Sequence, residues 1–419
     1  MRRRKRFRKT FILPPVLLAA IFIWLVASQR ANSRTAPDIL SGGPVENYRE
    51  SGNGGDQDGN LGMGTENSGG ETEEFLLKIE TAQKGNSSSG TGSDFGHLPG
   101  EEDGRVSLLF GGDIYLSDHV LNAYDKAGGV AGILDEGLRN EIASSDLFMA
   151  NEEFPFSDRG SAAEDKQFTF RLPPSRLHIM QEIGPDILTL ANNHILDYGT
   201  DALLDTCALL DEAGIRRVGA GANLDDAKKL EVMEVKGKRI GFLAASRVIP
   251  VSSWTVGKSH PGVLTTYDPA ILLTEIRAAE EQCDYLVVYI HWGIERNTEP
   301  EEYQRTLARQ YIDAGADLVV GSHPHVLQGI EYYKGKPILY SLGNFVFGSS
   351  IPQTMLVRVD VDEENGAVLS VIPATSSAGY TRQMDAGKKP GFYEGLKALS
   401  FDVTVDETGT IHPGTPQSP

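Results

Sequence analysis

The segment GADLVVGSHPHV (residues 315–326) joins an apolar run to two histidines. Residues 317–320 have the composition of a strand, and His323 and His325 follow where that strand would give way to a loop. Loops at strand ends are where α/β proteins place their binding and catalytic groups. Because imidazole nitrogens bind Zn, Mn and Fe, the segment predicts a metal site in an α/β fold.

Four other strand-like runs end on potential metal ligands in the same way. They are VSLLFGGD (106–113), LFMANEE (147–153), LTLANNHILDYG (188–199) and YLVVYIHWGIE (285–295). The chain has nine histidines, and four of them follow such runs, which indicates one shared site. The side chains that the five runs deliver are Asp113, Asn151, Glu152, Glu153, Asn193, His194, His291, Glu295, His323 and His325.

A two-metal hydrolytic site needs oxygen and nitrogen donors from several loops, one bridging oxygen and a nearby acid or base. Two residues apart, His323 and His325 are predicted to project from one side of an extended segment. His194 directly follows Asn193 and is the candidate acid toward a leaving oxygen. The candidate ligands for Zn, Mn or Fe are Asp113, Glu153, Asn193, His291, His323 and His325.

Each motif also has a purely structural interpretation. The alternatives are a helix N-cap at residues 192–194 (or at Asp197 and Thr200), a turn at residues 111–113, surface histidines at 323 and 325, a packed aromatic turn at residues 291–293, and a solvated Arg171 in FTFRLPP (168–174). The histidines without neighbouring donors are expected to be surface or core residues, and they are His119, His178, His260 and His412.

Strand-like and helical patterns alternate through the first part of the folded region. Strands are predicted at 106–110, 147–150, 186–191, 239–245, 285–290 and 317–320, and helices at 133–144, 201–215, 269–282 and 302–316. Two hairpins follow, with turns at residues 334–336 and at Asn365-Gly366. This order predicts two sheets packed face to face with helices outside.

The N-terminus predicts a membrane anchor. Residues 1–9 carry seven positive charges, and residues 10–28 carry none, which at about 1.5 Å per residue is long enough to cross a ~30 Å hydrocarbon layer. The basic flank predicts a cytoplasmic N-terminus and an extracellular domain. A cleaved signal peptide is the alternative, because residues 26–28 resemble a cleavage site.

Composition divides the rest of the chain. Residues 29–104 are acidic and rich in Gly and Ser, which predicts a disordered linker. Residues 105–380 are long enough for one sizeable α/β domain, and residues 381–419 are predicted to be a C-terminal extension whose last twenty residues fray.

The net charge of −19 argues against a nucleic-acid partner. Cys207 and Cys283 are expected to be buried free thiols, with one disulfide as the alternative.

Taken in order, seven segments resemble the poly-gamma-glutamate capsule synthesis (CapA) family, which is similar to the calcineurin-like metallophosphoesterases. The resemblance covers roughly residues 105–350. The segments are FGGDIYL (110–116), ANEEFP (150–155), FTFRLPP (168–174), LANNHILDYG (190–199), YIHWGIE (289–295), GADLVVGSHPHVLQGIE (315–331) and YSLGNFVF (340–347).

The resemblance implies a four-layer αββα sandwich with one or two divalent cations at one end of its sheets. It implies one metal position made by Asp113, Glu153 and His325, and a second made by Glu153, Asn193, His291 and His323. It further implies that His194 acts as the catalytic acid or base and that Arg171 lies near the anionic group of a substrate.

Two positions depart from the phosphoesterase pattern. Those enzymes usually carry a histidine two residues after the first aspartate, where this chain has Tyr115, and the bridging residue is Glu153 instead of an aspartate. One metal position therefore has one ligand fewer than in those enzymes.

Three functions follow from these observations. The first is a membrane-anchored extracellular accessory protein of poly-gamma-glutamate capsule biosynthesis or export, whose partners would be membrane components of a polymer synthase and the anionic polymer. The second is a metal-dependent phosphoesterase that acts on an extracellular or cell-wall phosphate ester. The third is a non-catalytic module that binds a polymer or a partner through the same fold.

Overall fold

The structure is a computed structural model that describes residues 104–362 and 366–414. The predicted anchor at residues 10–28 and the predicted linker up to residue 103 lie outside the described residues. Within the described part of the chain, no helix is both long and apolar enough to span a membrane.

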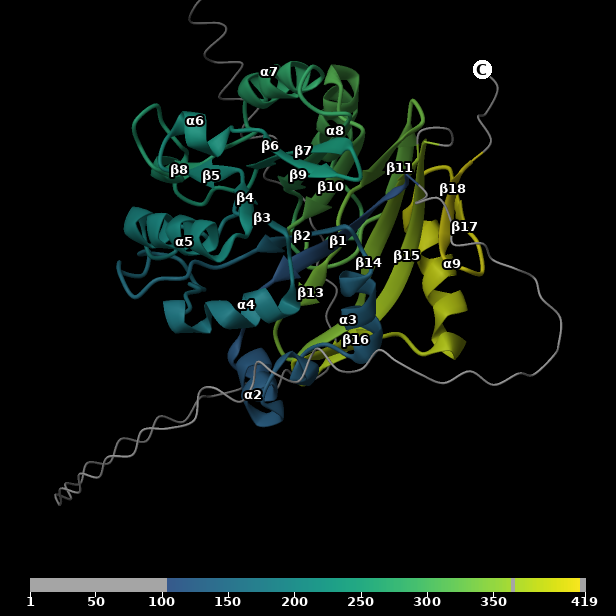
Figure 1. Ribbon diagram of the computed structural model, residues 1–419, viewed down its shortest axis with the longest axis horizontal. Helices are drawn as coiled ribbons and strands as arrows, with labels where there is room; N and C mark the ends of the chain where they lie inside the picture. The colour runs from purple at the N-terminus through teal and green to yellow at the C-terminus, as the bar shows by residue number, and fades with distance from the viewer. Residues whose placement is uncertain (1–103, 363–365, 415–419) are drawn as a thin grey trace, which may run out of the picture. The chain divides into compact units, whose positions relative to one another are not determined.

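The larger sheet has ten strands and a mixed arrangement (Figure 1). Its parallel part runs β1-β2-β3-β4, and β14 joins the other edge of β1 in the antiparallel direction. Beyond β14 follow β15, β18 and β17, while β13 pairs with β1 and β16 with β15. The bounds are β1 (Val106–Ile114), β2 (Leu147–Glu152), β3 (Ile187–Thr189), β4 (Arg216–Val218), β13 (Asn344–Val346), β14 (Ser350–Asp362), β15 (Gly366–Ser377), β16 (Tyr380–Gln383), β17 (Val403–Val405) and β18 (Thr410–Pro413).

The second sheet has six strands in the order β11-β12-β10-β9-β7-β6. Strands β7, β9, β10 and β12 are parallel, and β6 and β11 pair antiparallel at the two edges. The bounds are β6 (Glu231–Val235), β7 (Lys238–Ser246), β9 (Tyr285–His291), β10 (Leu318–Ser322), β11 (Ile330–Tyr333) and β12 (Lys336–Leu339). A separate pair is formed by β5 (Ala220–Gly221) and β8 (Gly262–Val263).

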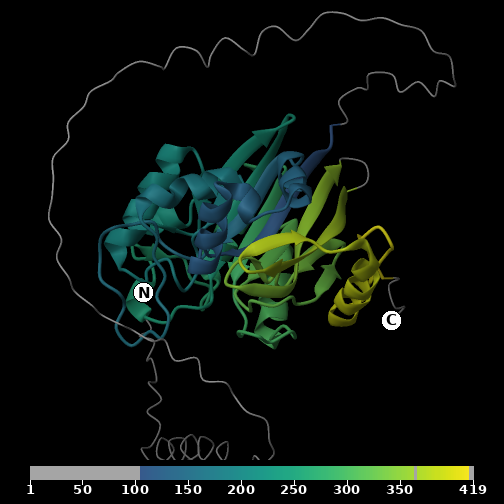
Figure 2. The same ribbon diagram turned by 90° about the horizontal axis from the view of Figure 1, so that it is seen from below.

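Alternating side chains of the second sheet face two different cores. Along β9, Val287 and Tyr289 belong to the core shared with the larger sheet. Val288 and Ile290 belong to a core shared with helices α7 (Ala270–Ala279) and α8 (Glu302–Ala314). The Tyr289 hydroxyl also donates a 3.0 Å hydrogen bond to the Gly111 carbonyl of β1. The two sheets therefore pack face to face, with α7 and α8 outside the second sheet (Figures 1 and 2).

Helices connect most of the parallel strands. Helix α8 starts with a capping box, in which the side chains of Glu301 and Gln304 each accept the other residue's backbone N–H. Helix α5 ends at Gly214 in the left-handed conformation, which glycine adopts without steric cost because it has no Cβ. The bounds are α2 (Asp118–Ala127), α3 (Glu136–Ala143), α4 (Leu177–Ile183), α5 (Thr200–Ala213), α6 (Leu224–Ala227), α7 (Ala270–Ala279), α8 (Glu302–Ala314) and α9 (Lys389–Leu399).

The prediction of a mixed α/β fold is confirmed, and each strand and helix predicted between residues 106 and 320 has a counterpart in the structure. The hairpin turn at residues 334–336 lies between β11 and β12, with Lys334 and Gly335 both left-handed. For the other hairpin, β14 and β15 pair as expected, and the turn at residues 363–365 lies outside the described residues. Both cysteines are free and buried, as predicted.

The expectation that the last twenty residues fray is wrong for residues up to 413. Strand β17 pairs with β18, and β18 pairs with β15, so this segment extends the larger sheet. Val403 and Ile411 are buried in its core, which compensates for the many turn-forming residues around them. The folded region thus continues beyond residue 380, where an extension was predicted to begin.

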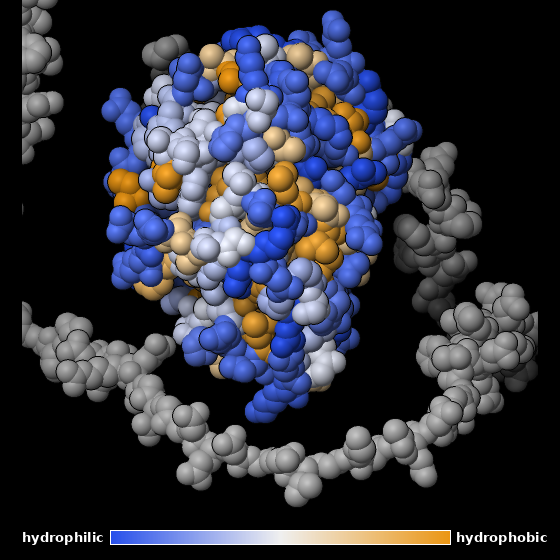
Figure 3. Space-filling model, turned by 90° about the vertical axis from the view of Figure 1, so that its left-hand side faces the viewer, coloured by the Kyte–Doolittle hydropathy of each residue, from blue (hydrophilic) through white to orange (hydrophobic). Residues whose placement is uncertain are grey.

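On the described part of the chain, the molecular face at the left of Figure 1 carries only small, separate apolar patches. Figure 3 shows hydrophobic groups on this face separated by hydrophilic residues. Small apolar groups of this kind are ordinary on soluble domains. In residues 104–362 and 366–414, the exposed large apolar side chains are Phe168, Val232, Tyr267, Ile271, Ile294 and Val368.

The end of β1 is shaped by two glycines. The pairing of β1 with β2 shifts between Phe110 and Asp113, and beyond this shift β1 pairs with β13. The Asp113 N–H donates to the Gly343 carbonyl at 2.9 Å. A Cβ on Gly112 would lie 1.8 Å from that same carbonyl oxygen, so only glycine permits this approach.

We expect the substitution Gly112→Ala to destabilise the protein by about 1–3 kcal/mol, because strand β1 or the chain at Gly343 must move to admit the methyl group. Thermal or chemical unfolding of the full-length protein would measure this. The matched control is Gly395→Ala in helix α9, where a Cβ would meet no atom within 4 Å and alanine should stabilise the helix by about 1 kcal/mol. Equal effects of the two substitutions would contradict the proposed close approach.

Candidate metal centre

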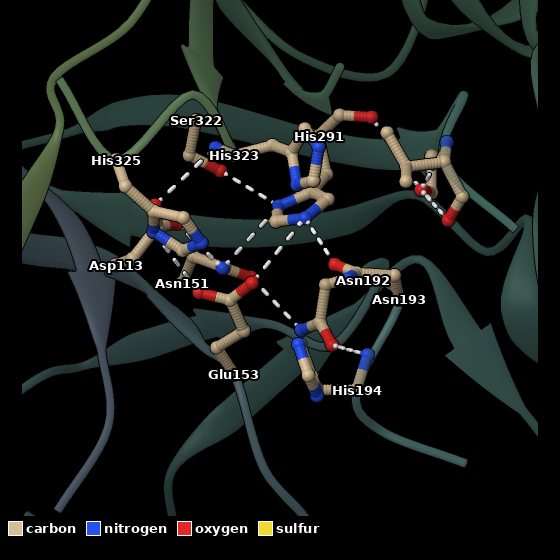
Figure 4. Close-up of polar contacts among 12 residues, drawn as sticks. Asp113, Asn151, Glu153, Asn192, Asn193, His194, His291, Ser322, His323 and His325 are labelled. Carbon is tan, nitrogen blue, oxygen red and sulfur yellow. Dashed lines mark hydrogen bonds and ion pairs between the residues drawn. The ribbon is translucent and has the colours of Figure 1, made fainter. Parts of the chain in front are cut away.

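The polar side chains that follow β1, β2, β3, β9 and β10 converge at one end of the two sheets (Figure 4). Strands β1 and β2 belong to the larger sheet and β9 and β10 to the smaller one. Because the carboxyl ends of parallel strands meet at the same sheet edge, segments far apart in the sequence come together here. The structure thus brings all six predicted metal ligands into one cluster.

One group of donors consists of Glu153, His291 and His323, whose ligand atoms all lie within 4.8 Å of one another. The Nε2 atom of His291 is 3.5 Å from Glu153 Oε1 and 2.7 Å from the side-chain oxygen of Asn193. The set of four donors predicted for this position is therefore assembled.

A second group consists of Asp113, Glu153 and His325, again within 4.8 Å of one another. The Nδ1 atom of His325 lies 3.3 Å from Asp113 Oδ2 and 3.9 Å from Glu153 Oε2. The same nitrogen lies 2.7 Å from the side-chain oxygen of Asn344, which the sequence did not single out. Glu153 belongs to both groups, as expected for a bridging carboxylate.

The carboxyl group of Glu153 is fully buried, and neither of its oxygens has a hydrogen-bond partner among the described residues. Burial, together with the nearby charge of Asp113, raises the pKa of Glu153 well above its usual value. The buried Nδ1 atom of His323 also lacks a partner within the described part of the chain. Buried polar atoms without partners are costly, and divalent cations held by the two donor groups would compensate for this cost, so the donor set fits a metal centre.

The three histidines differ in their protonation. Burial lowers the pKa of His291 well below its usual value and that of His323 to about 3, so both rings are neutral and can donate a lone pair to a metal. Burial alone would also lower the pKa of His325. The nearby carboxyl groups of Glu153 and Asp113 outweigh the effect of burial and raise the pKa of His325 to about 10. Without a metal, the His325 imidazolium lies beside the carboxyl groups of Asp113 and Glu153.

Other polar side chains orient the ligands. The Asn151 amide donates to Asp113 Oδ1 at 2.8 Å, and Asn192 in turn donates to the Asn151 oxygen at 3.0 Å. The Ser322 hydroxyl lies 3.0 Å from Nδ1 of His291, so the other ring nitrogen of this histidine faces Asn193 and Glu153. Such outer contacts set the tautomer and direction of a ligating imidazole.

The prediction that His323 and His325 lie on an extended segment is wrong. Both residues are left-handed, with φ of 97° and 57°. This conformation is unfavourable for residues with a Cβ and is typical of functional sites whose surroundings enforce it. Here the Pro324 carbonyl accepts the Arg296 N–H at 2.8 Å and the His323 N–H points to Asp113 Oδ2 at 3.3 Å. The bend sends the two rings into different donor groups.

His194 lies beside the cluster and is tied to Asp197. Its Nδ1 atom is 2.6 Å from Asp197 Oδ2, so Nδ1–H donates to the carboxylate and Nε2 carries the free lone pair. Burial lowers the pKa of His194, although the hydrogen bond to Asp197 opposes this effect. The ring stacks on Phe170 with a centroid distance of 4.1 Å.

Lys166 was not predicted, yet it contacts this loop directly. Its ammonium nitrogen lies 2.5 Å from the Asn193 carbonyl and 3.0 Å from His194 Nδ1, and it forms an ion pair with Asp197. The only sequence signal is a lysine shortly before FTFRLPP, in a stretch without regular periodicity. Its role depends on how that stretch folds back over residues 193–197.

Arg171, which the resemblance places near an anionic group, lies in the irregular segment that precedes α4. Its side chain is exposed, lies 4.0 Å over the ring of Tyr198 and donates to the Arg159 carbonyl at 3.2 Å. These contacts direct the guanidinium toward the loop of residues 159–160 and the ring of Tyr198, so the structure supports the alternative of a solvated arginine.

Tyr115 occupies the position where phosphoesterases usually carry another histidine. Its ring stacks on Phe170 at a centroid distance of 3.9 Å, and Phe170 in turn stacks on His194. An edge contact with Phe347 at 5.3 Å completes the packing. At this position the chain has an aromatic contact in place of a metal ligand.

Several of the structural alternatives can now be decided. Asn192 accepts the N–H groups of His194 and Ile195, so it closes a local turn while Asn193 faces His291. Glu295 is exposed at the edge of the site and belongs to neither donor group. The isolated histidines are all exposed, and they are His119, His178, His260 and His412.

Comparison with known proteins gives relatives for most of the described domain. Residues 107–349 match the model of the family described as bacterial capsule synthesis protein PGA_cap. The chain is 32% identical to the capsule biosynthesis protein CapA of Bacillus anthracis, over 66% of this chain and 69% of that protein. It is 35% identical to the PGA biosynthesis protein CapA of Bacillus subtilis (strain 168), over 60% of this chain and 66% of that protein.

Among solved structures, an NAD nucleotidase of Haemophilus influenzae aligns with 71% of this chain and 57% of its own, at 12% identity and a TM-score of 0.37. A TM-score this low carries no argument about the site. The family model spans more than half of the chain, and the first of these relatives is matched over more than two thirds of its length. The chain therefore belongs to the PGA_cap family of bacterial capsule synthesis proteins, the CapA family.

Proposed function

We propose that this protein is an accessory component of poly-gamma-glutamate capsule synthesis that uses a metal centre of metallophosphoesterase type. Support for the accessory role comes from the family and from the two CapA relatives, which are named for capsule and PGA biosynthesis. The matched regions span about two thirds of those relatives. We also propose that the two sheets and their outer helices form a four-layer αββα sandwich like that of the metallophosphoesterases.

The proposal of a metal centre rests mainly on the environment of the Glu153 carboxyl group. It is fully buried without a hydrogen-bond partner in the described chain, and it lies between two groups of nitrogen and oxygen donors. A purely structural cluster would pair such a group with a donor. The softness of the donor set suits Mn, Zn or Fe, with one ion held by Asp113, Glu153 and His325 and another by Glu153, Asn193, His291 and His323.

Divalent cations bound there would act as Lewis acids toward an ester or carboxylate oxygen and would acidify a water molecule. The residues of the chain would do the remaining work. Asp197 orients the His194 ring by accepting its Nδ1–H, and Nε2 can then accept a proton or return one to a leaving oxygen. Neutral His291 and His323 are ready to bind a metal without losing a proton.

We further propose that residues 10–28 anchor the protein in the cell membrane and that the domain lies outside the cell. The uncharged stretch and its basic flank support this proposal. The predicted linker of residues 29–104 would let the domain reach membrane components of a polymer synthase and the growing anionic chain.

A second candidate function is the hydrolysis of an extracellular or cell-wall phosphate ester. The observation that favours it is the His194–Asp197 pair beside the metal ligands, because a polymer-binding role alone requires no oriented proton donor.

The substitution Glu153→Gln should abolish stoichiometric metal binding, because Glu153 is shared by both donor groups. Metal analysis of the purified full-length protein after incubation with Mn²⁺ would measure this. The control is His119→Gln, which changes an exposed histidine that belongs to neither donor group and should bind as much Mn²⁺ as the wild type. Full Mn²⁺ occupancy in a folded Glu153→Gln variant would exclude the proposed bridging carboxylate.

Metal affinity should increase with pH between about 6 and 8. In the metal-free protein the pKa of His325 is about 10 and that of Glu153 is well above its usual value, so protons occupy groups that must be free to bind a cation. Binding therefore releases protons, and affinity should change roughly tenfold per pH unit for each proton released. Calorimetric titration with Mn²⁺ in buffers of different ionisation enthalpy would count them, and a pH-independent affinity would argue against this coupling.

In cells that need this protein for their capsule, Asp113→Asn should abolish capsule formation while the variant still reaches the surface at the wild-type level. The physical reason is that Asp113 is one of the ligands in the donor group with Glu153 and His325. It also accepts a hydrogen bond from the His323 backbone N–H. Capsule staining and surface labelling would be compared with the His119→Gln control.

A complete capsule in this variant would separate the metal centre from capsule synthesis. If the wild type also hydrolyses an aryl phosphate with Mn²⁺ and Asp113→Asn does not, that result would favour the phosphoesterase instead. An intact capsule without any such hydrolysis would exclude both catalytic functions.

A further inference from the structure

The segment between β2 and α4, residues 157–171, lies against the loop that carries Asn193 and His194. The Ala163 N–H donates to the Asp197 carbonyl at 2.8 Å, and the Phe170 N–H donates to Asp197 Oδ2 at 2.7 Å. Asp197 has no exposed side-chain surface. Two backbone bonds from one segment thus converge on this one buried acid.

Lys166 lies at the centre of this contact. Its side chain is only 14% exposed and its ammonium group passes 5.3 Å from the ring of Trp254. An ammonium group has three N–H donors. Two acceptors lie within reach, namely the Asn193 carbonyl and an oxygen of Asp197, while His194 Nδ1, which donates to Asp197, lies 3.0 Å from the ammonium nitrogen.

This arrangement favours a structural role over the binding of an anionic substrate. The Lys166 side chain is largely buried, and its ammonium group is directed toward the Asn193 carbonyl and the Asp197 carboxylate. The buried Asp197 carboxylate, on the other hand, needs a positive partner, because an unpaired buried charge is strongly destabilising. Lys166 supplies that partner and also holds the main chain at Asn193, directly before His194.

We propose that Lys166 is a positioning residue of the metal centre. It holds the loop of residues 193–197 so that the side-chain oxygen of Asn193 faces His291 and the ring of His194 stays against Asp197 and Phe170. This inference rests on the proposed function where it concerns metal binding, but the effect on the loop is independent of any metal.

Three variants of the full-length protein separate charge from packing. Lys166→Met keeps the length of the side chain and removes its charge, Lys166→Ala leaves space for an added amine, and Lys258→Met makes the same change at an exposed lysine. Hydrogen exchange of the metal-free proteins would be followed in residues 157–171 and 192–197.

We expect exchange in both segments to become at least about tenfold faster in Lys166→Met and Lys166→Ala, because a hydrogen-bonded charge has been removed from a buried acid. Lys258→Met should exchange like the wild type. Added propylammonium should restore slow exchange in Lys166→Ala, whereas 1-propanol of similar size should not. Wild-type exchange in Lys166→Met, or equal rescue by the alcohol, would overturn the proposal.

Mn²⁺ titrations of the same proteins connect the loop to the metal centre. Lys166→Met should weaken binding at the position that uses Asn193 about tenfold or more and leave the position that uses Asp113 and His325 intact. Unchanged binding despite faster exchange would overturn the link to the metal. If the wild type binds no Mn²⁺, the proposed metal centre fails, and the exchange experiment still decides the role of Lys166 in the loop.

Discussion

The buried carboxyl group of Glu153 is the constraint on which the site depends. Removing an ionised carboxylate from water costs several kcal/mol even after the protein relaxes. Glu153 has no hydrogen-bond donor among the described residues to offset this cost, and Asp113 adds a second acid nearby. The positive charge of the His325 ring compensates in part when no metal is bound. A divalent cation would compensate more fully, because both oxygens of Glu153 face nitrogen and oxygen donors that suit a metal.

The fold accepts unfavourable backbone geometry to assemble this cluster. Gly112 lets strand β1 approach Gly343 so closely that no other residue fits, which sets the direction of Asp113. His323 and His325 both adopt the left-handed conformation, so that one ring joins His291 while the other joins Asp113. Local strain of this kind persists only where the surroundings enforce it, and it is concentrated at functional sites. The surroundings here are the two packed sheets.

Much of this arrangement could be predicted because the ligands follow strands. A strand that ends on Asp113 or His291 places its side chain at a sheet edge whatever the detailed packing, and the edges of the parallel strands coincide. Lys166 and Asn344 could not be predicted in this way, because they lie in irregular segments and reach the site only through long-range folding. Strand β18 was missed because the sequence around Ile411 is dominated by residues typical of turns.

The two donor groups are unequal, and this bears on function. One combines Glu153, His291 and His323 with the Asn193 oxygen, while the other has Asp113, Glu153 and a His325 that must first lose a proton. Tyr115 packs against Phe170 at the position where a further ligand would strengthen the second group. The first group is therefore better prepared to hold a cation permanently, and the second would bind one more weakly and with a stronger dependence on pH.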